Sequence, residues 1–537
     1  MKFFTRSILI VLALYGIVFA VGAAYIAHVG APLWVALLFP VAMVLFQYLI
    51  SPWLIEWVMD IDWYDNGGGL PDANRAFVEH LCAERGLKVP RIGIIPSGTP
   101  NAFSFGRLRS DARVVVTSGL LDVLTVDEAN AVLAHEIGHI EHFDFIVMTL
   151  ASLAPLLLYQ LYVWTEKIDS VRAIAYTAYL CYLVSQYVVL LLNRTREYFA
   201  DHYAAEVTLT PGLLSSALVK IAYGMVRADG DAKRAMAEGD KEEKAEWRRK
   251  QRLAGAVALM GISNVRSGAA LALSTANSSE AAAVMRWDLT NPWARLYELS
   301  STHPLTAFRV RELNRQAESM HQAVEYPLPD DQGVPIRGFP LEVFLWAAPV
   351  VSFAVLFVSY FVPGVFHSLR IQLPPDAAPV LLIFAGLTWS LRIFYRYRGT
   401  FQPAQIGTLL QDLEVSQMNP RAVTLTGTIL GRGLPGAFWS PDLVLRDSTG
   451  MIFVLYRASI PLARWFFAVA AAENYIGQEV VIEGWFRRGL RPYVELSKLT
   501  GKDLAVHRSY SCWIQLTAAA IALTGGIFWL YPALMPF

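Results

Sequence analysis

Two histidines and a glutamate in the run His135-Glu136-Ile-Gly-His139 have the residue types and the spacing that hydrolytic chemistry requires. Histidines four residues apart lie one turn apart on the same face of a helix, so both imidazoles can reach one ion. Glu136 is placed to take a proton from water bound to that ion. Two neutral imidazoles and a carboxylate suit zinc, which leaves a fourth position for water whose pKa falls to about 7. The run therefore predicts a hydrolytic site with one zinc ion per chain.

The helix that carries these residues is expected to begin at Thr125. Glu128 follows three residues later, which is the spacing of a capping box, and the side chains of such a pair satisfy each other's backbone N–H groups. The turn that precedes His135 is apolar. We therefore expect a capped helix that carries the two histidines on one face.

A zinc site of this kind needs a third protein ligand, and spacing leaves two candidates. The pattern with glycine at position 142 and histidine at position 145 fails, because the chain has His142 and Phe145 there. His142 itself lies seven residues after His135, on the same helix face, and spacing does not exclude it. The other candidate is the pair Glu197 and Asp201 on a later helix, where one carboxylate could bind metal and the other could orient a ligand histidine.

The composition places these residues in a membrane protein. Of 537 residues, 55% are hydrophobic and 17% are charged, whereas soluble globular chains carry about 25% charged residues. Lys+Arg and Asp+Glu are equal at 45 each, which removes the electrostatic argument for a nucleic-acid binder. Three widely separated cysteines exclude a disulfide scaffold. The lipid bilayer is an expected partner, and nucleic acid is not.

Seven stretches are long and apolar enough to be transmembrane helices of about 20 residues. The sixth contains Arg392 near one end, where the side chain could reach the interface. The expected spans are 7–29, 31–50, 145–164, 173–193, 343–368, 377–395 and 509–537. A signal peptide is a poor description of the first, because a second apolar run follows it at once.

Lys and Arg residues near the span ends predict the orientation. Pairs of basic residues precede the first span and follow the fourth and sixth, which are ends that share one side if the spans alternate. That side is expected to be cytoplasmic. Lys167 and Arg172 lie on the opposite side and weaken the bias.

The expected fold is an α-helical polytopic membrane protein with about seven spans and a mainly helical zincin-type metallopeptidase domain that carries a small β-hairpin or sheet. A C-terminal OB-like β-barrel domain completes it. The expected parts are a transmembrane hairpin (1–59), the first part of the catalytic domain (60–144), a second hairpin (145–193), the second catalytic part (194–339), a third hairpin (340–398), the β domain (399–505) and a last transmembrane helix (506–537).

Four ordered motifs between about residues 60 and 320 resemble those of the membrane zinc metallopeptidases that include bacterial HtpX and the CaaX prenyl endopeptidases. The motifs are Asn101-Ala-Phe-Ser-Phe-Gly106 leading to Val114-Val-Val-Thr-Ser-Gly-Leu-Leu121, His135-Glu-Ile-Gly-His139, Arg196-Glu-Tyr-Phe-Ala-Asp201, and Ser301-Thr-His-Pro-Leu305 with Arg309. The arrangement of spans is more similar to HtpX, although residues 330–537 have no counterpart in the short HtpX form.

This resemblance implies roles for residues that spacing alone left open. It makes Glu197 the third zinc ligand beside His135 and His139, and it makes Asp201 a helper in the surrounding shell. It also implies that His303 faces the active site and could stabilise the oxyanion.

The segment before the zinc helix predicts where an unfolded substrate could bind. The β-branched run 114–117 follows the stretch 101–105 across a polar turn, so the two are expected to form a hairpin. An unfolded peptide can pair with an exposed strand edge through main-chain hydrogen bonds. We therefore expect Asn101, Ala102 and Phe103 to bind substrate; the alternative is that the phenylalanines are merely core residues.

The C-terminal polar block alternates in the manner of strands. Three strands, a helix over 461–475 and two further strands follow the order of an OB-type barrel. The expected strands are 423–430, 443–447, 451–457, 479–486 and 493–499. Residues 402–505 hold ten Lys+Arg and nine Asp+Glu, so a structural or substrate-adaptor role is preferred over nucleic-acid binding.

The sequence predicts an integral-membrane zinc endopeptidase of the HExxH gluzincin type, in which Glu136 passes a proton from water to the leaving amine. By resemblance, the substrates would be misfolded or surplus membrane proteins, cleaved at the cytoplasmic side of the cell membrane. The alternatives are prenyl-protein processing and a non-enzymatic scaffold with structural zinc. A structural zinc site would not need Glu136, a carboxylate that binds no metal. The sequence does not determine the oligomeric state.

Overall fold

In the computed structural model, the chain divides into two compact units. The structure describes residues 33–59, 61–64, 69–98, 100–166, 172–221, 278–328, 338–361, 374, 376–432, 442–457, 467, 472–489, 492–501 and 506–534. The first unit contains Met1–Leu289, Arg295–Asp330 and Pro435–Ala437, and the second contains Thr290–Ala294, Asp331–Leu434 and Phe438–Phe537. The expected zinc site belongs to the first unit, and the expected β domain belongs to the second.

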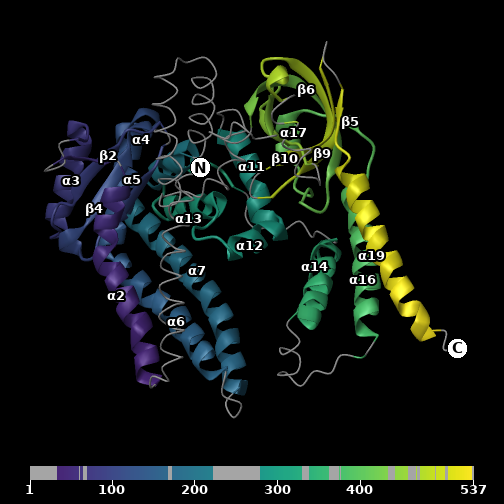
Figure 1. Ribbon diagram of the computed structural model, residues 1–537. Helices are drawn as coiled ribbons and strands as arrows, with labels where there is room; N and C mark the ends of the chain where they lie inside the picture. Colours follow the sequence, from purple (N-terminus) through teal and green to yellow (C-terminus); the bar gives the residue numbers. More distant parts are fainter. Residues whose placement is uncertain are drawn as a thin grey trace. The chain divides into compact units, whose positions relative to one another are not determined.

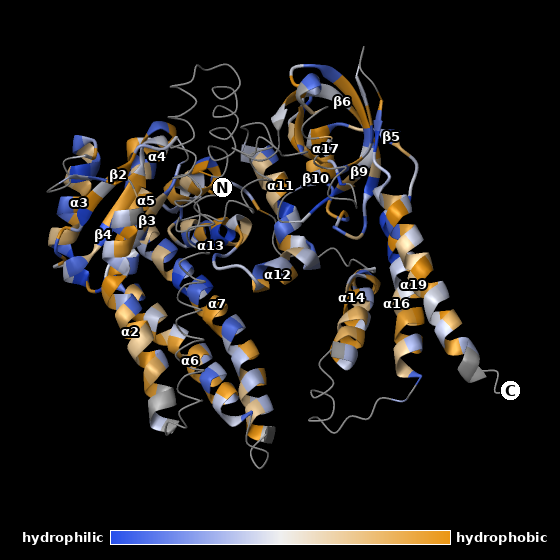
Figure 2. Cartoon of the chain, in the orientation of Figure 1, coloured by the Kyte–Doolittle hydropathy of each residue, from blue (hydrophilic) through white to orange (hydrophobic). Residues whose placement is uncertain are grey.

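Six helices in the described part of the chain are long and apolar enough to cross a membrane. Apolar residues run along all of them (Figure 2). They are α2 (Leu33–Val58), α6 (Asp144–Thr165), α7 (Arg172–Thr208), α14 (Phe339–Phe361), α16 (Ala377–Arg396) and α19 (Ser511–Leu534). They coincide with six of the seven expected spans, including the one that contains Arg392. The first expected span, 7–29, lies outside the described residues.

The first unit contains a four-stranded sheet in the order β1-β2-β4-β3. Strands β2 and β4 are parallel, whereas β1 and β3 are antiparallel to their neighbours. The strands are β1 (Asp62–Tyr64), β2 (Arg91–Ile95), β3 (Ala102–Phe105) and β4 (Arg113–Thr117). The predicted hairpin is confirmed, because β3 pairs with β4 across a short 3-10 turn (η2, Arg109–Asp111). Since β3 has one neighbour in this order, it is an edge strand.

Helices cover the sheet and form the rest of the unit (Figure 1). A core of buried aliphatic residues from β4, α5 and α7 joins the sheet to the helices, and it includes Val114, Leu133 and Ala204. The described helices here are α3 (Asp72–Glu84), α4 (Ser118–Val123), α5 (Val126–Glu141), α6, α7, a short helix at Pro211–Ile221, and α13 (Thr306–Ser319). Helices α11 (Ser278–Thr290) and α12 (Pro292–Leu299) contain the boundary with the second unit.

In the second unit, strand pairing closes a ring of five strands. Strand β6 pairs with β7, β7 with β8, β8 with β10, β10 with β9, and β9 with β6. The pairing is antiparallel except between β8 and β10. These strands are β6 (Arg421–Arg432), β7 (Leu443–Arg446), β8 (Met451–Leu455), β9 (Glu479–Arg487) and β10 (Tyr493–Gly501). All five expected strands are present, so a small β-barrel follows the membrane helices.

Short elements complete the barrel. Strand β5 (Gln402–Pro403) adds to β6, and β11 (His507–Arg508) adds to β10 just before α19. Helix α17 (Ile406–Leu410) follows β5. Of the helix expected over 461–475, the described residues show a 3-10 turn, η5 (Ala472–Tyr475); most of the remainder lies outside the described residues.

Candidate metal centre

Helix α5 begins where the sequence predicts, with a complete capping box. The Thr125 side chain accepts a hydrogen bond from the Glu128 backbone, and the Glu128 carboxylate accepts one from the Thr125 backbone. Glu128 also accepts hydrogen bonds from Ser216 and Lys220. The start of the helix is therefore tied to the short helix at Pro211–Ile221, which helps to fix the position of the histidines further along α5.

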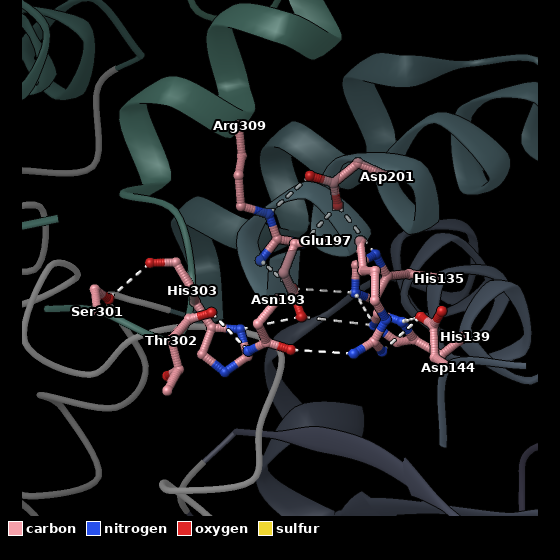
Figure 3. A network of polar contacts seen from close by, with 11 residues as sticks. His135, His139, Asp144, Asn193, Glu197, Asp201, Ser301, Thr302, His303 and Arg309 are labelled. Carbon is pink, nitrogen blue, oxygen red and sulfur yellow. Dashed lines mark hydrogen bonds and ion pairs between the residues drawn. The ribbon is translucent and has the colours of Figure 1, made fainter. Parts of the chain in front are cut away.

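His135, His139 and Glu197 meet at one point. The two Nε2 atoms are 3.2 Å apart, and each lies 3.7 Å from a different oxygen of Glu197. These three are the one group of metal-ligating side chains with this geometry within the described residues. All three are buried. Helix α5 supplies the histidines, and α7, which continues unbroken beyond its apolar stretch, supplies the glutamate (Figure 3).

His135 is oriented from behind by a buried ion pair. Its Nδ1 lies 3.0 Å from Asp201 Oδ1, which leaves Nε2 to face Glu197. Arg309 on α13 donates two hydrogen bonds to Asp201, at 2.8 and 2.5 Å. Burial lowers the pKa of Arg309, but the charges of Asp201 and Glu197 outweigh it and the pKa is raised. Burial raises the pKa of Asp201, but the charge of Arg309 outweighs it and lowers the pKa, so an ionised carboxylate fixes the ring.

His139 is oriented in the same way by Asp144. Its Nδ1 lies 2.5 Å from Asp144 Oδ2, and Arg196 holds that carboxylate at 2.7 Å. Burial lowers the pKa of His139, but the hydrogen bond with Asp144 and the charge of Glu197 outweigh it and raise the pKa. Phe143 has a φ of 58°, in the left-handed region, and this sharp reversal between α5 and α6 brings Asp144 back to the ring.

His303 also faces the glutamate, with Nδ1 3.2 Å from Glu197 Oε1. The loop that carries it is held by α7, because Asn193 donates a hydrogen bond to the Thr302 carbonyl and Arg194 donates one to the Ser301 carbonyl. Figure 3 shows His303 beside Glu197 on the side away from Asp144. The fourth motif is therefore brought to the site, 106 positions along the chain from Glu197.

The donor set fits a zinc ion. Two imidazole Nε2 atoms and a carboxylate converge, and their separations of 3.2 to 3.7 Å suit ligand bonds of about 2.0–2.2 Å in a tetrahedral arrangement. Both Nδ1 atoms face carboxylates, which selects the tautomer whose Nε2 can bind metal. Glu197 Oε2 is buried and makes no hydrogen bond within the described part of the chain, and its nearest cationic group there is Arg309 Nη1 at 3.5 Å. A cation would satisfy that oxygen.

The structure also places two residues whose positions spacing could not give, His142 and Asp144. His142 ends α5, and its ring packs near those of Phe199 and Tyr203 rather than among the three donors. Asp144 was not predicted, although an acidic residue five positions after His139 was a signal that could have identified it. Glu136 is 2% exposed and lies between the two histidines on α5.

The expected substrate-binding strand lies at the sheet edge beside α5. Phe103 is 3% exposed and packs with Phe105 and Val115 in a second core cluster, so its side chain is a core element. Asn101 is buried as well, and its side-chain oxygen accepts a hydrogen bond from the Ala102 backbone N–H. Substrate contact by this strand would therefore involve the backbone.

Comparison with known proteins agrees with this geometry. The sequence model of peptidase family M48 matches residues 74–317, a range that contains all three metal-ligating candidates. The protease HtpX homolog of Methanothermobacter thermautotrophicus is 38% identical over 224 residues, which are 41% of this chain and 84% of that protein. The chain belongs to peptidase family M48. It is an HtpX-like, multi-pass membrane protease.

Other similar proteins are matched at lower identity. The HtpX homolog of Moorella thermoacetica is 37% identical over 165 residues, which are 28% of this chain and 55% of that protein. Among solved structures, S. mikatae Ste24p has a TM-score of 0.35 at 15% identity, over 57% of this chain and 65% of that chain. This last likeness is too distant to support an argument. The β-barrel lies beyond the range that the family model matches.

Proposed function

We propose that this chain is a zinc endopeptidase that cleaves peptide bonds of protein substrates at a membrane. The observation that supports it best is the convergence of His135, His139 and Glu197 in a chain of family M48. These three would hold one zinc ion. When bound, zinc would polarise the scissile carbonyl and make water acidic enough to attack it at neutral pH.

The neighbouring residues would supply the remaining functions. Glu136 would take the proton of the attacking water and deliver it to the leaving amine. Asp201 and Asp144 would hold the ligand rings in place from behind. His303 would donate a hydrogen bond to the oxyanion, for which its position 3.2 Å from Glu197 is suitable.

Strand β3 would hold the substrate by β-augmentation. The Thr117 N–H donates to the Asn101 carbonyl, so these two residues form a hydrogen-bonded pair. In an antiparallel pair such residues alternate with others whose backbone groups face outward. Ser104 lies three residues after Asn101, so it is one of the residues whose backbone groups face outward. Its N–H and C=O point to the free edge of the sheet, where the residue is partly exposed. Main-chain pairing there would accept many sequences.

This mode of binding suits misfolded or surplus membrane proteins as substrates. Glu197 lies on the same continuous helix as the expected fourth span, 173–193. It is four residues beyond Asn193, which at 1.5 Å per residue is about 6 Å along the helix. The site would lie on the cytoplasmic side of the cell membrane, as the basic residues after the fourth span indicate. A cysteine at Ser110 labelled from outside intact cells by an impermeant reagent would contradict that orientation.

Three finer assignments belong to the same proposal. Residues 7–29 would add a seventh span to the six that are described. The five-stranded ring, with its parallel β8–β10 pair, would be an OB-type barrel. The domain boundaries would be those predicted from the sequence, and α7 continues through the boundary between residues 193 and 194.

The Glu136→Gln variant of the purified full chain tests the function. It should retain about one zinc ion per chain, measured by elemental mass spectrometry, and lose cleavage of casein, because the base is removed while the ligands stay. Glu84→Gln makes the same change on the exposed end of α3 and should behave like wild type. Casein cleavage by Glu136→Gln at the wild-type rate would remove Glu136 from the mechanism.

A further inference from the structure

A buried charge cluster joins the end of α16 to the barrel in the second unit. Glu495 on β10 accepts a hydrogen bond from Arg487 at 2.8 Å and one from Tyr397 at 2.6 Å. Arg396, the last residue of α16, lies 3.4 Å from the same carboxylate. Arg487 is fully buried and also donates to the Arg396 carbonyl at 2.6 Å. This cluster fixes the barrel to the membrane helix.

The cluster carries more positive than negative charge. Arg392 lies one turn before Arg396 on the same face of α16. Burial raises the pKa of Glu495, but Arg487, Arg396 and Arg457 outweigh it and lower the pKa to about 2. Asp442 is the other acidic residue whose charge acts on Arg457. Among the described residues, four guanidinium groups thus face one carboxylate in contact, Glu495, and one that acts only through its charge, Asp442.

Part of this excess is not neutralised by the described residues. Arg396 Nε is buried and makes no hydrogen bond to the described residues. Arg392 donates to a backbone carbonyl, that of Trp346, at 3.3 Å. Arg457 is exposed, and its guanidinium lies over the Tyr493 ring, 5.4 Å from the centroid. Within the described part of the chain, no carboxylate comes within 4.0 Å of Arg392 or Arg457.

The cluster lies where two membrane helices reach their ends. Helix α16 ends at Arg396, and α19 begins at Ser511, after Ser509 donates a hydrogen bond to the Arg457 carbonyl. Tyr510 and Trp513 are 61% and 69% exposed at that end of α19. Exposed tyrosine and tryptophan at the ends of apolar helices are typical of the level of the lipid headgroups.

We propose that Arg392, Arg396 and Arg457 bind the phosphate of an anionic phospholipid headgroup. Guanidinium groups bind phosphate through paired hydrogen bonds, and a phosphate would use the free donors and neutralise the excess charge. Basic pockets between membrane helices are known to take anionic headgroups. The exposed aromatic residues favour a lipid over a soluble phosphate, because the same molecule would place its acyl chains against α19. Such a lipid would strengthen the attachment of the barrel to the spans.

Native mass spectrometry of the detergent-purified full chain tests the site, with phosphatidylglycerol and phosphatidylcholine as probes. Wild type should bind phosphatidylglycerol more tightly. Arg392→Gln and Arg457→Gln should each weaken that binding about fivefold, the factor for about 1 kcal/mol per basic residue, and leave phosphatidylcholine binding unchanged. Arg446→Gln is the matched control. Arg446 is exposed and pairs with Met451, the first residue of β8. Arg457 follows the opposite end of that strand.

Three outcomes would overturn the proposal. Equal affinity of wild type for both lipids would show that the cluster has no headgroup preference. Unchanged phosphatidylglycerol binding in both variants would show that the arginines serve only the barrel. Inorganic phosphate that displaces phosphatidylglycerol at equal concentration would identify a site for soluble anions. If one variant fails to fold, its unfolding temperature in phosphatidylcholine would reveal this. The other variant then decides the question, together with the loss of wild-type phosphatidylglycerol binding at about 1 M salt.

Discussion

Replacing Asp144 with asparagine should weaken metal binding although no proposed ligand is touched. The carboxylate holds His139 Nδ1 at 2.5 Å and Arg196 at 2.7 Å; Asp144 and His139 are buried, and the Arg196 side chain is 12% exposed. A neutral amide can still accept one hydrogen bond, but it cannot favour the correct tautomer as strongly or balance the charge of Arg196. Loss of such an outer partner costs about 10- to 100-fold in metal affinity, which corresponds to about 1.4–2.7 kcal/mol.

The same substitution should also lower the free energy of unfolding. Breaking one side of a buried ion pair costs about 3–5 kcal/mol. We expect the lower end of that range, because Arg196 keeps a hydrogen bond to Asn193 Oδ1 at 3.2 Å. Zinc affinity would be measured by competition with a fluorescent chelator, and stability by thermal unfolding with and without zinc.

The control for this experiment is Asp122→Asn, the same chemical change at an exposed position on α4. It should leave zinc affinity and unfolding as in wild type. A zinc dissociation constant within about twofold of wild type for Asp144→Asn would refute the reasoning, since the expected loss is at least tenfold. The Asp144 contact would then be a consequence of packing and not a support for the ligand.

Three further predictions concern other parts of the chain. Glu197→Ala should lose zinc, and His142→Ala should keep it; the reverse result in metal analysis would make His142 the third ligand. Ser104→Pro removes one backbone donor at the sheet edge and should raise KM for an unfolded substrate about 2- to 10-fold at unchanged zinc content, whereas Ser104→Ala should not; equal KM values would exclude β3 as the docking edge. Glu495→Gln should lower the unfolding temperature at pH 7, and because the pKa of Glu495 is lowered, the difference should fade as the pH drops from 4.5 to about 2; a constant difference in thermal scans would contradict this.

The sequence by itself determined the features that depend on local spacing. The capping box at Thr125, the two histidines one turn apart and the β3–β4 hairpin follow from periods of 3.6 and 2 residues or from turn residues close by. The six apolar helices follow from continuous apolar runs of about 20 residues. These patterns need no knowledge of distant parts of the chain, because the helix or strand geometry alone brings the residues together. The positions of the five barrel strands along the chain were predicted for the same reason.

Spacing could not choose between His142 and Glu197, and it missed Asp144. The choice depends on how α7 packs against α5, which brings Glu197 to the histidines and Tyr203 to His142. Asp144 reaches His139 only because Phe143 takes a left-handed conformation, which its residue type does not favour. Such a conformation is imposed by the packing around it.

Tertiary structure also decided where several charged residues lie. Arg487 and Arg488 are fully buried in the barrel, where Arg487 donates to Glu495 and Arg488 donates to the Leu410 carbonyl. Arg309 pairs with Asp201 across 108 positions of sequence. A buried charge is stable only when a partner of opposite charge or a set of hydrogen bonds meets it, and that partner comes from long-range packing. The sequence therefore names the chemical groups, and the fold decides which of them meet.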